Sequence, residues 1–364
     1  MNFVENLRYK KILVAPLDWG LGHATRCIPI IRLLQKNGCE VTIAASGAIK
    51  ILLQSEFPGI LFIDLNGYNI QYSSNKRLLP VKILLQLPKI VAAVRRENAW
   101  LKKLVDEKRF DAVISDNRFG LFTSKIPCVF ITHQLLIQAP FGWLQNRVQK
   151  LNYRYINRYS ECWVPDFEEG GGLAGKLSHP EKLPAVPVRY LGPLSRFEAI
   201  ASTTQPRYSW LMIISGPEPQ RSMLEKKLLA VAPKLHGKVL LVRGKPGSAE
   251  HVEVPANCTA VNHLTTAQMQ DAIVASGYIV SRCGYTTVME MLAMGKKAVF
   301  IPTPGQTEQE YLAPHLAKQG WCYYCEQDDD VEQHLNAAKT FAYKLPDVKQ
   351  SALESVVKSW LESW

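Results

Sequence analysis

Residues 281–310 read SRCGYTTVMEMLAMGKKAVFIPTPGQTEQE, and this stretch decides the fold. A short apolar strand over 278–280 leads into it, a helix opens at Thr286, and a second apolar strand over 298–301 ends in a Pro-Gly loop. Glycine beside hydroxyl side chains at a helix start leaves backbone N–H groups at the positive end of the helix dipole, where a phosphate binds readily. Glu290 lies about one turn further along, where a carboxylate can accept both ribose hydroxyls. The stretch predicts a pocket for a nucleoside diphosphate, and no G-x-G-x-x-G nicotinamide fingerprint accompanies it.

A second glycine-rich loop lies near the N-terminus and reads DWGLGHATR over 18–26. His23 stands at a predicted helix start, where the helix dipole lowers the pKa of an imidazole and keeps it neutral. A neutral His23 suits a general base that deprotonates an acceptor hydroxyl. The alternatives are a histidine that contacts phosphate without proton transfer and a histidine that only caps the helix. Asp18 is close enough in sequence to orient His23 or to replace it as the base.

Together these two motifs resemble GT-B glycosyltransferases, specifically the family that contains the lipid-linked muramoyl-pentapeptide N-acetylglucosaminyltransferase and has a family 28 type C-terminal domain. Its members have a Ser/Cys-Arg-x-Gly-[AY]-x-T-x-x-E helix start, a later Gln-rich loop, and a first loop that ends in Gly-His. The resemblance implies an α/β protein with two doubly wound, Rossmann-like parallel-sheet domains that face each other across a cleft. It also implies a UDP-sugar donor, inversion by one direct displacement, and no metal or other cofactor, because helix dipole and arginine replace the cation.

The resemblance assigns the donor-binding residues by region. The diphosphate is expected at the 281–287 segment and at two glycine loops, one at 20–22 and one at 215–216. The second loop takes the place of the family's Ser-Gly-Gly-Ser motif, with Pro217 in place of the second glycine. The ribose is expected at Glu290, the sugar at the polar loop after 301, and the uracil near the backbone of 263–264. The expected donor residues are Gly20, Gly22, Ser215, Gly216, Arg221, His263, Leu264, Ser281, Arg282, Gly284, Tyr285, Thr286, Thr287, Glu290, Gln306, Glu308 and Gln309.

Polar residues at predicted strand ends in the N-terminal half are candidates for the acceptor side. Asp116 ends the strand that reads VISD, Arg118 follows it, and His133 ends the next strand. Side chains at the carboxyl ends of parallel strands face the ligand-binding edge of the sheet. Asp116 is therefore an alternative catalytic base, and Arg118 and His133 are candidate acceptor contacts. A turn-closing role for Asp116 remains the alternative.

Strand-helix alternation predicts the domain organisation. Short Val- and Ile-rich runs are separated by amphipathic helices in both halves, which is typical of parallel sheets covered on both faces. We expect an acceptor-side domain over 1–192 and a nucleotide-sugar domain over 193–345. The segment 346–364 carries apolar residues from Leu353 to Trp364 at helical spacing. It is expected to form a terminal helix that packs on the N-terminal domain, with packing on its own domain as the alternative.

Composition and charge restrict the expected cellular location of the protein and its expected binding partners. The net charge is +11, and residues 1–192 hold all of the excess, with 26 Lys and Arg against 15 Asp and Glu. Without a basic stripe interleaved with aromatic residues, nucleic acid is not an expected partner. The apolar and basic segments 82–109 and 143–158 are either ordinary packing helices or a surface for peripheral contact with an anionic membrane. Scattered cysteines and the lack of a signal sequence predict a cytoplasmic protein, on the inner face of the membrane where such contact occurs.

The sequence therefore predicts a metal-independent inverting glycosyltransferase that moves a hexose or N-acetylhexosamine from a UDP-sugar to an acceptor, lipid-linked or glycan. A nucleotide-sugar hydrolase is the first alternative, because related hydrolases carry a Gly-x-Gly-His-x-x-Arg-Cys run that residues 20–27 match. A binding protein without turnover is the second alternative. Release of free sugar from donor alone identifies the hydrolase, and tight UDP binding without product identifies the binding protein.

Overall fold

The computed structural model describes residues 10–68, 79–107, 109–138, 142–198, 205–348 and 352–364. The chain divides into two compact units at Leu194 and Ser195, close to the predicted boundary after Gly192. Of the described residues, the first unit holds 10–68, 83–194 and 352–364, and the second holds 79–82 and 195–348. Each unit is described by itself.

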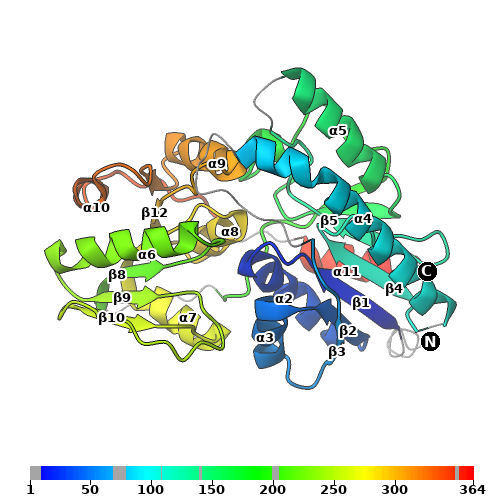
Figure 1. Cartoon of the computed structure of the whole chain (residues 1–364), viewed down its shortest axis with the longest axis horizontal. Helices are drawn as coiled ribbons and strands as arrows, with labels where there is room; N and C mark the ends of the chain where they lie inside the picture. Colours follow the sequence, from blue (N-terminus) through cyan, green and yellow to red (C-terminus); the bar gives the residue numbers. More distant parts are fainter. Residues whose placement is uncertain (1–9, 69–78, 108, 139–141, 199–204, 349–351) are drawn as a thin grey trace. The chain divides into compact units, whose positions relative to one another are not determined.

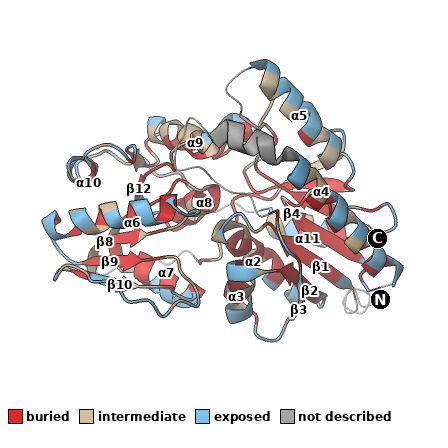
Figure 2. Cartoon of the chain, viewed as in Figure 1, coloured by how far each residue is buried: buried red, intermediate tan, exposed pale blue. Residues whose placement is uncertain are grey.

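The first unit contains a seven-stranded parallel sheet in the order β3-β2-β1-β4-β5-β6-β7. Its central strands are apolar and buried along their length, as expected for a parallel sheet covered by helices (Figure 2). The strands are β1 (Lys11–Pro16), β2 (Glu40–Ala45), β3 (Leu61–Asp64), β4 (Ala112–Asp116), β5 (Cys128–Ile131), β6 (Glu161–Val164) and β7 (Val188–Tyr190). The helices are α2 (Leu21–Lys36), α3 (Gly47–Glu56), α4 (Leu79–Asp106), α5 (Gly142–Ile156) and α11 (Leu353–Glu362), with a 3-10 turn at Gly175–Leu177 (Figure 1). Residues 79–82 of α4 belong to the second unit.

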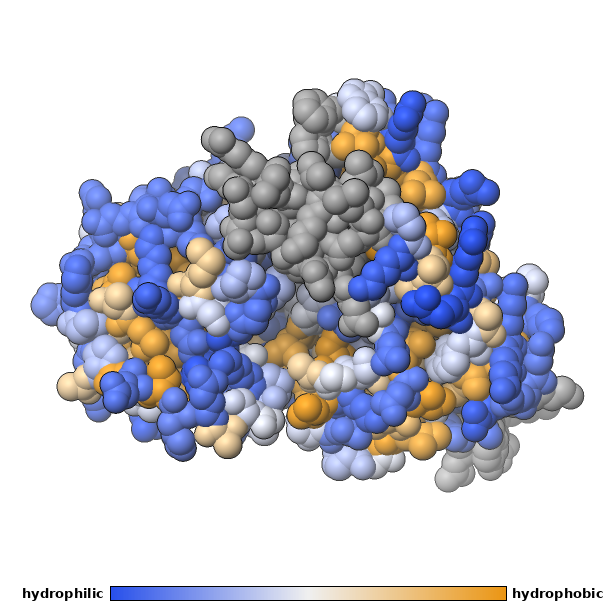
Figure 3. All heavy atoms as spheres, in the orientation of Figure 1, coloured by the Kyte–Doolittle hydropathy of each residue, from blue (hydrophilic) through white to orange (hydrophobic). Residues whose placement is uncertain are grey.

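The second unit contains a six-stranded parallel sheet in the order β10-β9-β8-β11-β12-β13. The strands are β8 (Tyr208–Ile213), β9 (Val239–Val242), β10 (Cys258–Val261), β11 (Ser276–Ser281), β12 (Lys297–Phe300) and β13 (Tyr323–Tyr324). The helices are α6 (Gln220–Val231), α7 (Thr266–Val274), α8 (Tyr285–Ala293), α9 (Thr307–Lys318) and α10 (Val331–Ala338), with a 3-10 turn at Ala232–Lys234. Hydrophilic side chains predominate on the face drawn in Figure 3.

The terminal helix α11 packs on the first unit. Trp360 is 1% exposed, and its ring meets that of Trp163 edge to face with the centroids 5.3 Å apart. Lys10 Nζ donates to the carbonyl oxygens of Leu361 and Trp364, at 2.5 Å in each case, and lies over the Trp364 ring. These contacts join both ends of the described chain to the same sheet.

Both sheets have the order reversal that creates a ligand-binding edge. In the first unit β1 pairs with both β2 and β4, and in the second β8 pairs with both β9 and β11. Ligands bind at the carboxyl ends of such strands, where the connections leave in opposite directions. The loops after β1, β4, β8 and β11 carry most of the predicted site residues.

Candidate active site

The loop after β1 leads directly into α2. Gly20 is the N-cap residue, and its φ of 143° lies in a region that only glycine adopts without strain. His23 is in the first turn, and its backbone N–H donates to Gly20 O at 3.3 Å. The first turn has no acidic residue and no side-chain cap. The positive end of the α2 dipole therefore acts on the His23 imidazole.

His23 contacts a buried ion pair between α2 and the end of β4. Its Nδ1 lies 2.9 Å from Oδ2 of Asp116, whose side chain is fully buried. Arg26 donates from Nε to Asp116 Oδ1 at 2.9 Å, and its Nη2 makes a second contact to the same oxygen. His23 and Arg26 are three residues apart and so share one face of α2. One carboxylate thus holds both side chains in place.

The charges of this group can be assigned from the pKa shifts. Burial lowers the pKa of His23 below 6.5, Arg26 lowers it further, and Asp116 only partly opposes the shift. Burial raises the pKa of Asp116, but Arg26 and His23 outweigh it, so the carboxyl has a pKa below its ordinary value. At neutral pH the pair is a neutral imidazole and a carboxylate. The Nδ1 atom of His23 lies near both Asp116 Oδ2 and Arg26 Nη2, the latter at 2.8 Å. In the tautomer with the proton on Nδ1, Asp116 accepts that proton and Nε2 retains the lone pair that a general base requires.

Arg118 lies inside the first unit, which does not fit the predicted acceptor contact. Its side chain is fully buried and donates to three backbone carbonyls, those of Pro16, Leu65 and Asn66. Its Nη1 also lies 2.5 Å from Glu97 of α4, and the Glu97 carboxyl is 4% exposed. Arg118 therefore joins loops of the first unit, since a strand-end position does not by itself decide which way a long side chain turns.

Asp18 and His133 also differ from their predicted places. The Asp18 carboxylate lies against Gly67, where an added Cβ would come within 1.7 Å of it. The carboxylate that contacts His23 is that of Asp116, so an orienting role for Asp18 has no support in these contacts. His133 is 3% exposed, and its Nδ1 lies 3.4 Å from Nη1 of Arg26. His133 is thus behind the ion pair rather than at a surface that an acceptor reaches.

In the second unit, the predicted phosphate seat is the start of α8. β11 ends at Ser281, and Gly284 is the N-cap of the helix, with no side-chain cap and no acidic residue in the first turn. A methyl group added at Gly284 would meet no heavy atom within 4 Å. Among the described residues, this helix start is therefore open and uncompensated by a carboxylate of its own first turn. Both properties favour an anion.

Arg282 was predicted to face the diphosphate, but its side chain is buried and bonds to backbone carbonyls of neighbouring loops. It is 1% exposed, and Nη1 donates to the carbonyls of Ile301 and Pro302 at 3.2 and 3.0 Å. Nη2 donates to Gln220 O at 2.9 Å and to Gln327. Burial lowers the pKa of Arg282 to about 10, so it stays charged at neutral pH. It ties together the loops after β8 and β12, which flank the start of α8.

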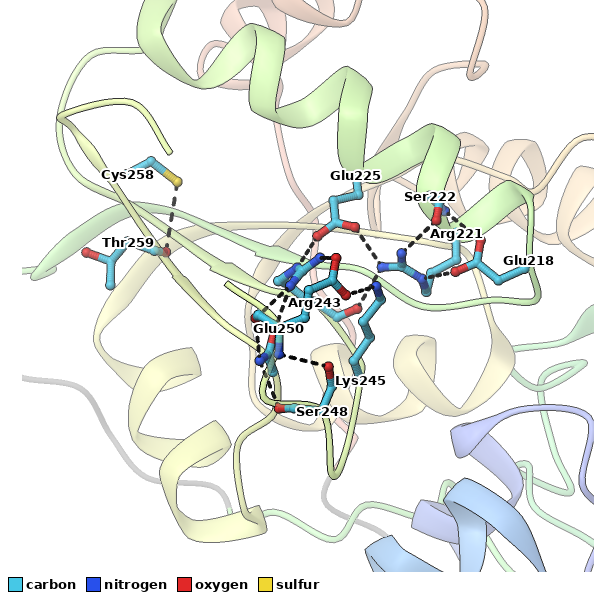
Figure 4. A network of polar contacts seen from close by, with 11 residues as sticks. Glu218, Arg221, Ser222, Glu225, Arg243, Lys245, Ser248, Glu250, Cys258 and Thr259 are labelled. Atoms are coloured by element: carbon cyan, nitrogen blue, oxygen red, sulfur yellow. Dashed lines mark hydrogen bonds and ion pairs between the residues drawn. The ribbon is translucent and has the colours of Figure 1, made fainter. Parts of the chain in front are cut away.

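Arg221 is engaged in a similar way, within the network drawn in Figure 4. Its Nε lies 2.5 Å from Glu218 Oε1, and its Nη1 lies 2.9 Å from Glu225 Oε2. Glu225 also pairs with Arg243, which contacts Glu250. Two carboxylates therefore neutralise Arg221, so its predicted role as a cation for the leaving diphosphate has no support here. The network instead fixes the loops after β8 and β9.

Glu290 has a partner that sequence reasoning missed. Its carboxyl is buried, and Oε1 lies 3.0 Å from Nε of Arg196, which follows directly on the division between the units. Burial raises the pKa of Glu290, and Arg196 opposes the shift. Burial also lowers the pKa of His263, with a smaller contribution from Arg196. Arg196 therefore brings the predicted ribose residue and the predicted uracil region into one electrostatic group.

The loop after β12 places the predicted sugar residues around the N-terminus of α9. Gln306 is the N-cap, and its Oε1 accepts from Gln309 Nε2 at 2.6 Å. Gln309 is buried, and its Oε1 accepts from Thr303 N at 2.9 Å. Gln306 and Glu308 are half-buried. Gln306 is thus partly accessible to a ligand, while Gln309 fixes the backbone of the loop at Thr303.

The acidic run at 328–330 serves local structure. Asp330 is the N-cap of α10 and accepts from Gln333 N at 3.2 Å, as predicted for a capping residue. Asp329 accepts from Glu326 N at 2.8 Å. Across the described parts of the chain, no group of three or more His, Cys, Asp or Glu residues has a geometry that could hold a metal ion.

One of the contacts above could have been found from sequence, and the others could not. Arg26 follows His23 at helical spacing, which is a signal for a shared face. Arg196 lies in a polar connection with no periodicity, so nothing in the sequence pairs it with Glu290. The burial of Arg221 and Arg282 depends on partners such as Arg243 and Gln327, far away in the chain.

Comparison with known proteins adds independent evidence. Residues 218–352 match the model of the glycosyltransferase family 28 C-terminal domain. A UDP-N-acetylglucosamine–N-acetylmuramyl-(pentapeptide) pyrophosphoryl-undecaprenol N-acetylglucosamine transferase of Haemophilus ducreyi is 26% identical over 334 residues, covering 90% of this chain and 88% of the relative. An uncharacterized glycosyltransferase of Methanosarcina acetivorans is 24% identical, covering 85% of this chain and 84% of the relative.

Solved structures share the fold over nearly the whole chain. MurG of Acinetobacter baumannii has a TM-score of 0.57 at 17% identity, covering 98% of this chain and 100% of that one. The spinosyn rhamnosyltransferase SpnG, complexed with thymidine diphosphate, has a TM-score of 0.61 at 13% identity, covering 96% and 95%. The predicted fold class is confirmed, with two Rossmann-like parallel-sheet units. The chain is thus a glycosyltransferase of the GT-B fold that resembles the muramoyl-pentapeptide N-acetylglucosaminyltransferases.

Proposed function

We propose that this glycosyltransferase moves a hexose or N-acetylhexosamine from a UDP-sugar to an acceptor hydroxyl, with inversion and without a metal ion. The observation that carries the proposal is the open start of α8 with Glu290 one turn further in, inside the region that matches the family 28 domain. The relatives that act on UDP-N-acetylglucosamine support the choice of nucleotide. The acceptor, lipid-linked or glycan, is chosen by residues outside this motif.

The His23–Asp116 pair supplies the proton transfer. Neutral Nε2 accepts the proton of the acceptor hydroxyl, while Asp116 holds the Nδ1 proton and stabilises the imidazolium that forms. The acceptor oxygen bonds to the anomeric carbon as the bond from that carbon to the diphosphate oxygen breaks. The electron pair leaves with UDP, whose developing charge meets the positive end of α8. Arg196 lies beside Glu290 and is a candidate contact for the ribose and for the diphosphate.

UDP release from a panel of UDP-sugars tests this proposal, with and without lipid-phosphate and glycan acceptors. Release that requires an acceptor supports the transferase. Equal release of UDP and free sugar with donor alone supports the nucleotide-sugar hydrolase. Tight UDP binding with no release from any donor supports a binding protein and contradicts the proposal.

Removal of the Glu290 carboxylate should weaken donor binding. It also takes this ion-pair partner from the Arg196 side chain, which is 9% exposed, so melting curves establish that the variant is folded before binding is measured. Glu290→Ala removes an acceptor for the ribose hydroxyls, so we expect UDP affinity to fall by roughly 1.5–3 kcal/mol, the range for hydrogen bonds to a charged group. Calorimetric titration with UDP measures the change. Glu253→Ala, an exposed carboxylate of the same unit, is the matched control and should bind UDP normally. Unchanged affinity in Glu290→Ala would show that the ribose binds elsewhere.

Chelation should leave turnover nearly unchanged. The α8 start already presents positive charge to the diphosphate, and Asp329 and Asp330 already accept backbone N–H groups of their own segment. We expect turnover in excess EDTA to stay within about twofold of that with Mg²⁺, small against the tenfold change per 1.36 kcal/mol. Loss of turnover with EDTA and its recovery with Mg²⁺ or Mn²⁺ would contradict a metal-independent leaving group.

We extend the proposal to peripheral contact of the first unit with an anionic membrane surface. A groove of about 400 Å³ between α4 and α5 is lined by apolar side chains together with Arg95, Lys102, Arg154 and Arg158. Trp143 and Leu151 of α5 are 62% and 44% exposed, and hydrophilic and apolar residues adjoin in this region of Figure 3. Within the described residues, no helix is both long and apolar enough to span a bilayer. Co-sedimentation with vesicles that contain phosphatidylglycerol tests this contact.

A further inference from the structure

Thr303, in the loop after β12, has a buried hydroxyl group without a partner. The residue is 1% exposed, and among the described residues no group accepts from or donates to its Oγ1. Its backbone is satisfied, because Thr303 N donates to Gln309 Oε1 at 2.9 Å. An unsatisfied buried polar group destabilises a protein, because it has lost its hydrogen bonds to water. A group outside the chain that bonds to this hydroxyl would remove that cost.

The hydroxyl faces the glycine loop on the other side of β11. A Cβ added to Gly216 would find one heavy atom within 4 Å, the Thr303 Oγ1 at 3.9 Å. Gly216 has a φ of 104° and therefore keeps a conformation that suits glycine. In the sheet, β8 and β12 lie on either side of β11. The loops that carry Gly216 and Thr303 thus flank the segment that leads into α8.

Arg282 fixes this arrangement. Its guanidinium, in the segment between β11 and α8, donates to Pro302 O, directly before Thr303, and to Gln220 O at the start of α6. The hydroxyl, the glycine loop and the open helix start at Gly284 are therefore held at one edge of the sheet. A hydroxyl donor at an open helix start is suited to an anionic oxygen.

We propose that Thr303 donates a hydrogen bond from Oγ1 to a phosphate oxygen of the donor's diphosphate. The proposal rests on the proposed function, since it takes the start of α8 as the diphosphate seat. Thr303 is assigned to the diphosphate because its hydroxyl lies beside Gly216, in a loop where the diphosphate is expected. It is a donor-binding residue that the helix-start motif does not contain.

If Thr303 has this role, removal of its hydroxyl should preserve or raise stability and should weaken the binding of UDP. Thr303→Val keeps the branched shape and removes a hydroxyl that has no partner in the free protein. Its melting temperature should therefore equal or exceed that of the wild type, whereas its affinity for UDP should fall about tenfold, as for one charge-assisted hydrogen bond. Thr303→Ser retains the hydroxyl and should bind UDP within about threefold of the wild type. A purely structural threonine would show a lower melting temperature and unchanged affinity.

Calorimetric titration of the full chain with UDP, dTDP and uridine tests the proposal, with melting curves in parallel. Thr259→Val, at an exposed position of β10, is the matched control. A loss in Thr303→Val that is confined to the nucleoside diphosphates supports the phosphate contact. Equal UDP affinity in Thr303→Val and wild type overturns it, as does an equal loss for uridine. If the wild type binds neither diphosphate, the proposed function itself fails, and this contact fails with it.

Discussion

His23→Ala should lower turnover by on the order of 10²–10⁴, the usual contribution of a positioned general base, while UDP affinity stays intact. The two effects separate because His23 lies in the first unit and the predicted donor residues from Ser215 to Gln309 lie in the second. Turnover is measured as UDP release and affinity by titration. His251→Ala, at an exposed position, is the control. A variant that keeps more than about a third of wild-type turnover would exclude His23 as the base.

The pH dependence gives a second readout of the same residue. Burial and Arg26 keep the pKa of His23 below 6.5. A base acts in its neutral form, so the rate should rise with pH, pass its midpoint below pH 6.5, and stay level through neutrality. His23→Ala should lose this acid limb. A loss in UDP affinity without a loss in turnover would instead make His23 a phosphate ligand.

The fold was largely predictable because its signals are local. Apolar runs such as Val41–Ala45, which is followed by helix α3, specify buried parallel strands wherever they occur. The strands β6, β7, β10 and β13 were not predicted. Strands β7 and β13 have only three and two residues, β10 is partly exposed, and the buried β6 begins with the charged Glu161. Helix α4 also continues through Pro88, since tertiary packing can outweigh a proline that weakens one turn.

The helix starts of the site were predictable, because local backbone geometry determines them. The contacts of its long side chains were not predictable, because they depend on partners from other elements. Gly20 and Gly284 begin helices at strand ends, as their motifs indicate. Arg118, Arg221 and Arg282 were assigned to ligands because arginine near a strand end suits an anion. Each is buried against carbonyls or carboxylates from other elements, and burying a charge requires such partners. These partners lie far apart in sequence, so only the folded chain reveals them.

Asp116→Asn should reduce both stability and turnover. Asp116 and Arg26 form a buried ion pair, and removal of one charge leaves the other unpaired, which destabilises proteins by about 3–5 kcal/mol. The amide also no longer fixes the proton on Nδ1 of His23, so turnover should fall by on the order of 10²–10⁴ even in folded protein. Denaturant titration and UDP release measure the two effects. Asp111→Asn, exposed and bonded to Lys11 N, is the control.

The stability effect should also depend on pH in a defined direction. The folded pKa of Asp116 lies below its ordinary value of 3.8. The ion pair therefore stabilises the fold above that pH and ceases to do so as the pH falls through the folded pKa. The difference in unfolding free energy between wild type and Asp116→Asn should be full at neutral pH and shrink in strong acid. A difference that stays constant down to the acid transition would contradict the assigned charge.

A double-mutant cycle separates orientation of the base from catalysis by the carboxylate itself. If Asp116 acts through His23, Asp116→Asn should cost little more turnover in a His23→Ala background, less than about threefold. The loss of stability should remain, because the Arg26–Asp116 contact does not pass through the imidazole. Both variants are compared at a pH and temperature where each is folded. Additive losses in turnover would assign proton transfer to Asp116 directly, although its burial and lowered pKa make it a weak base.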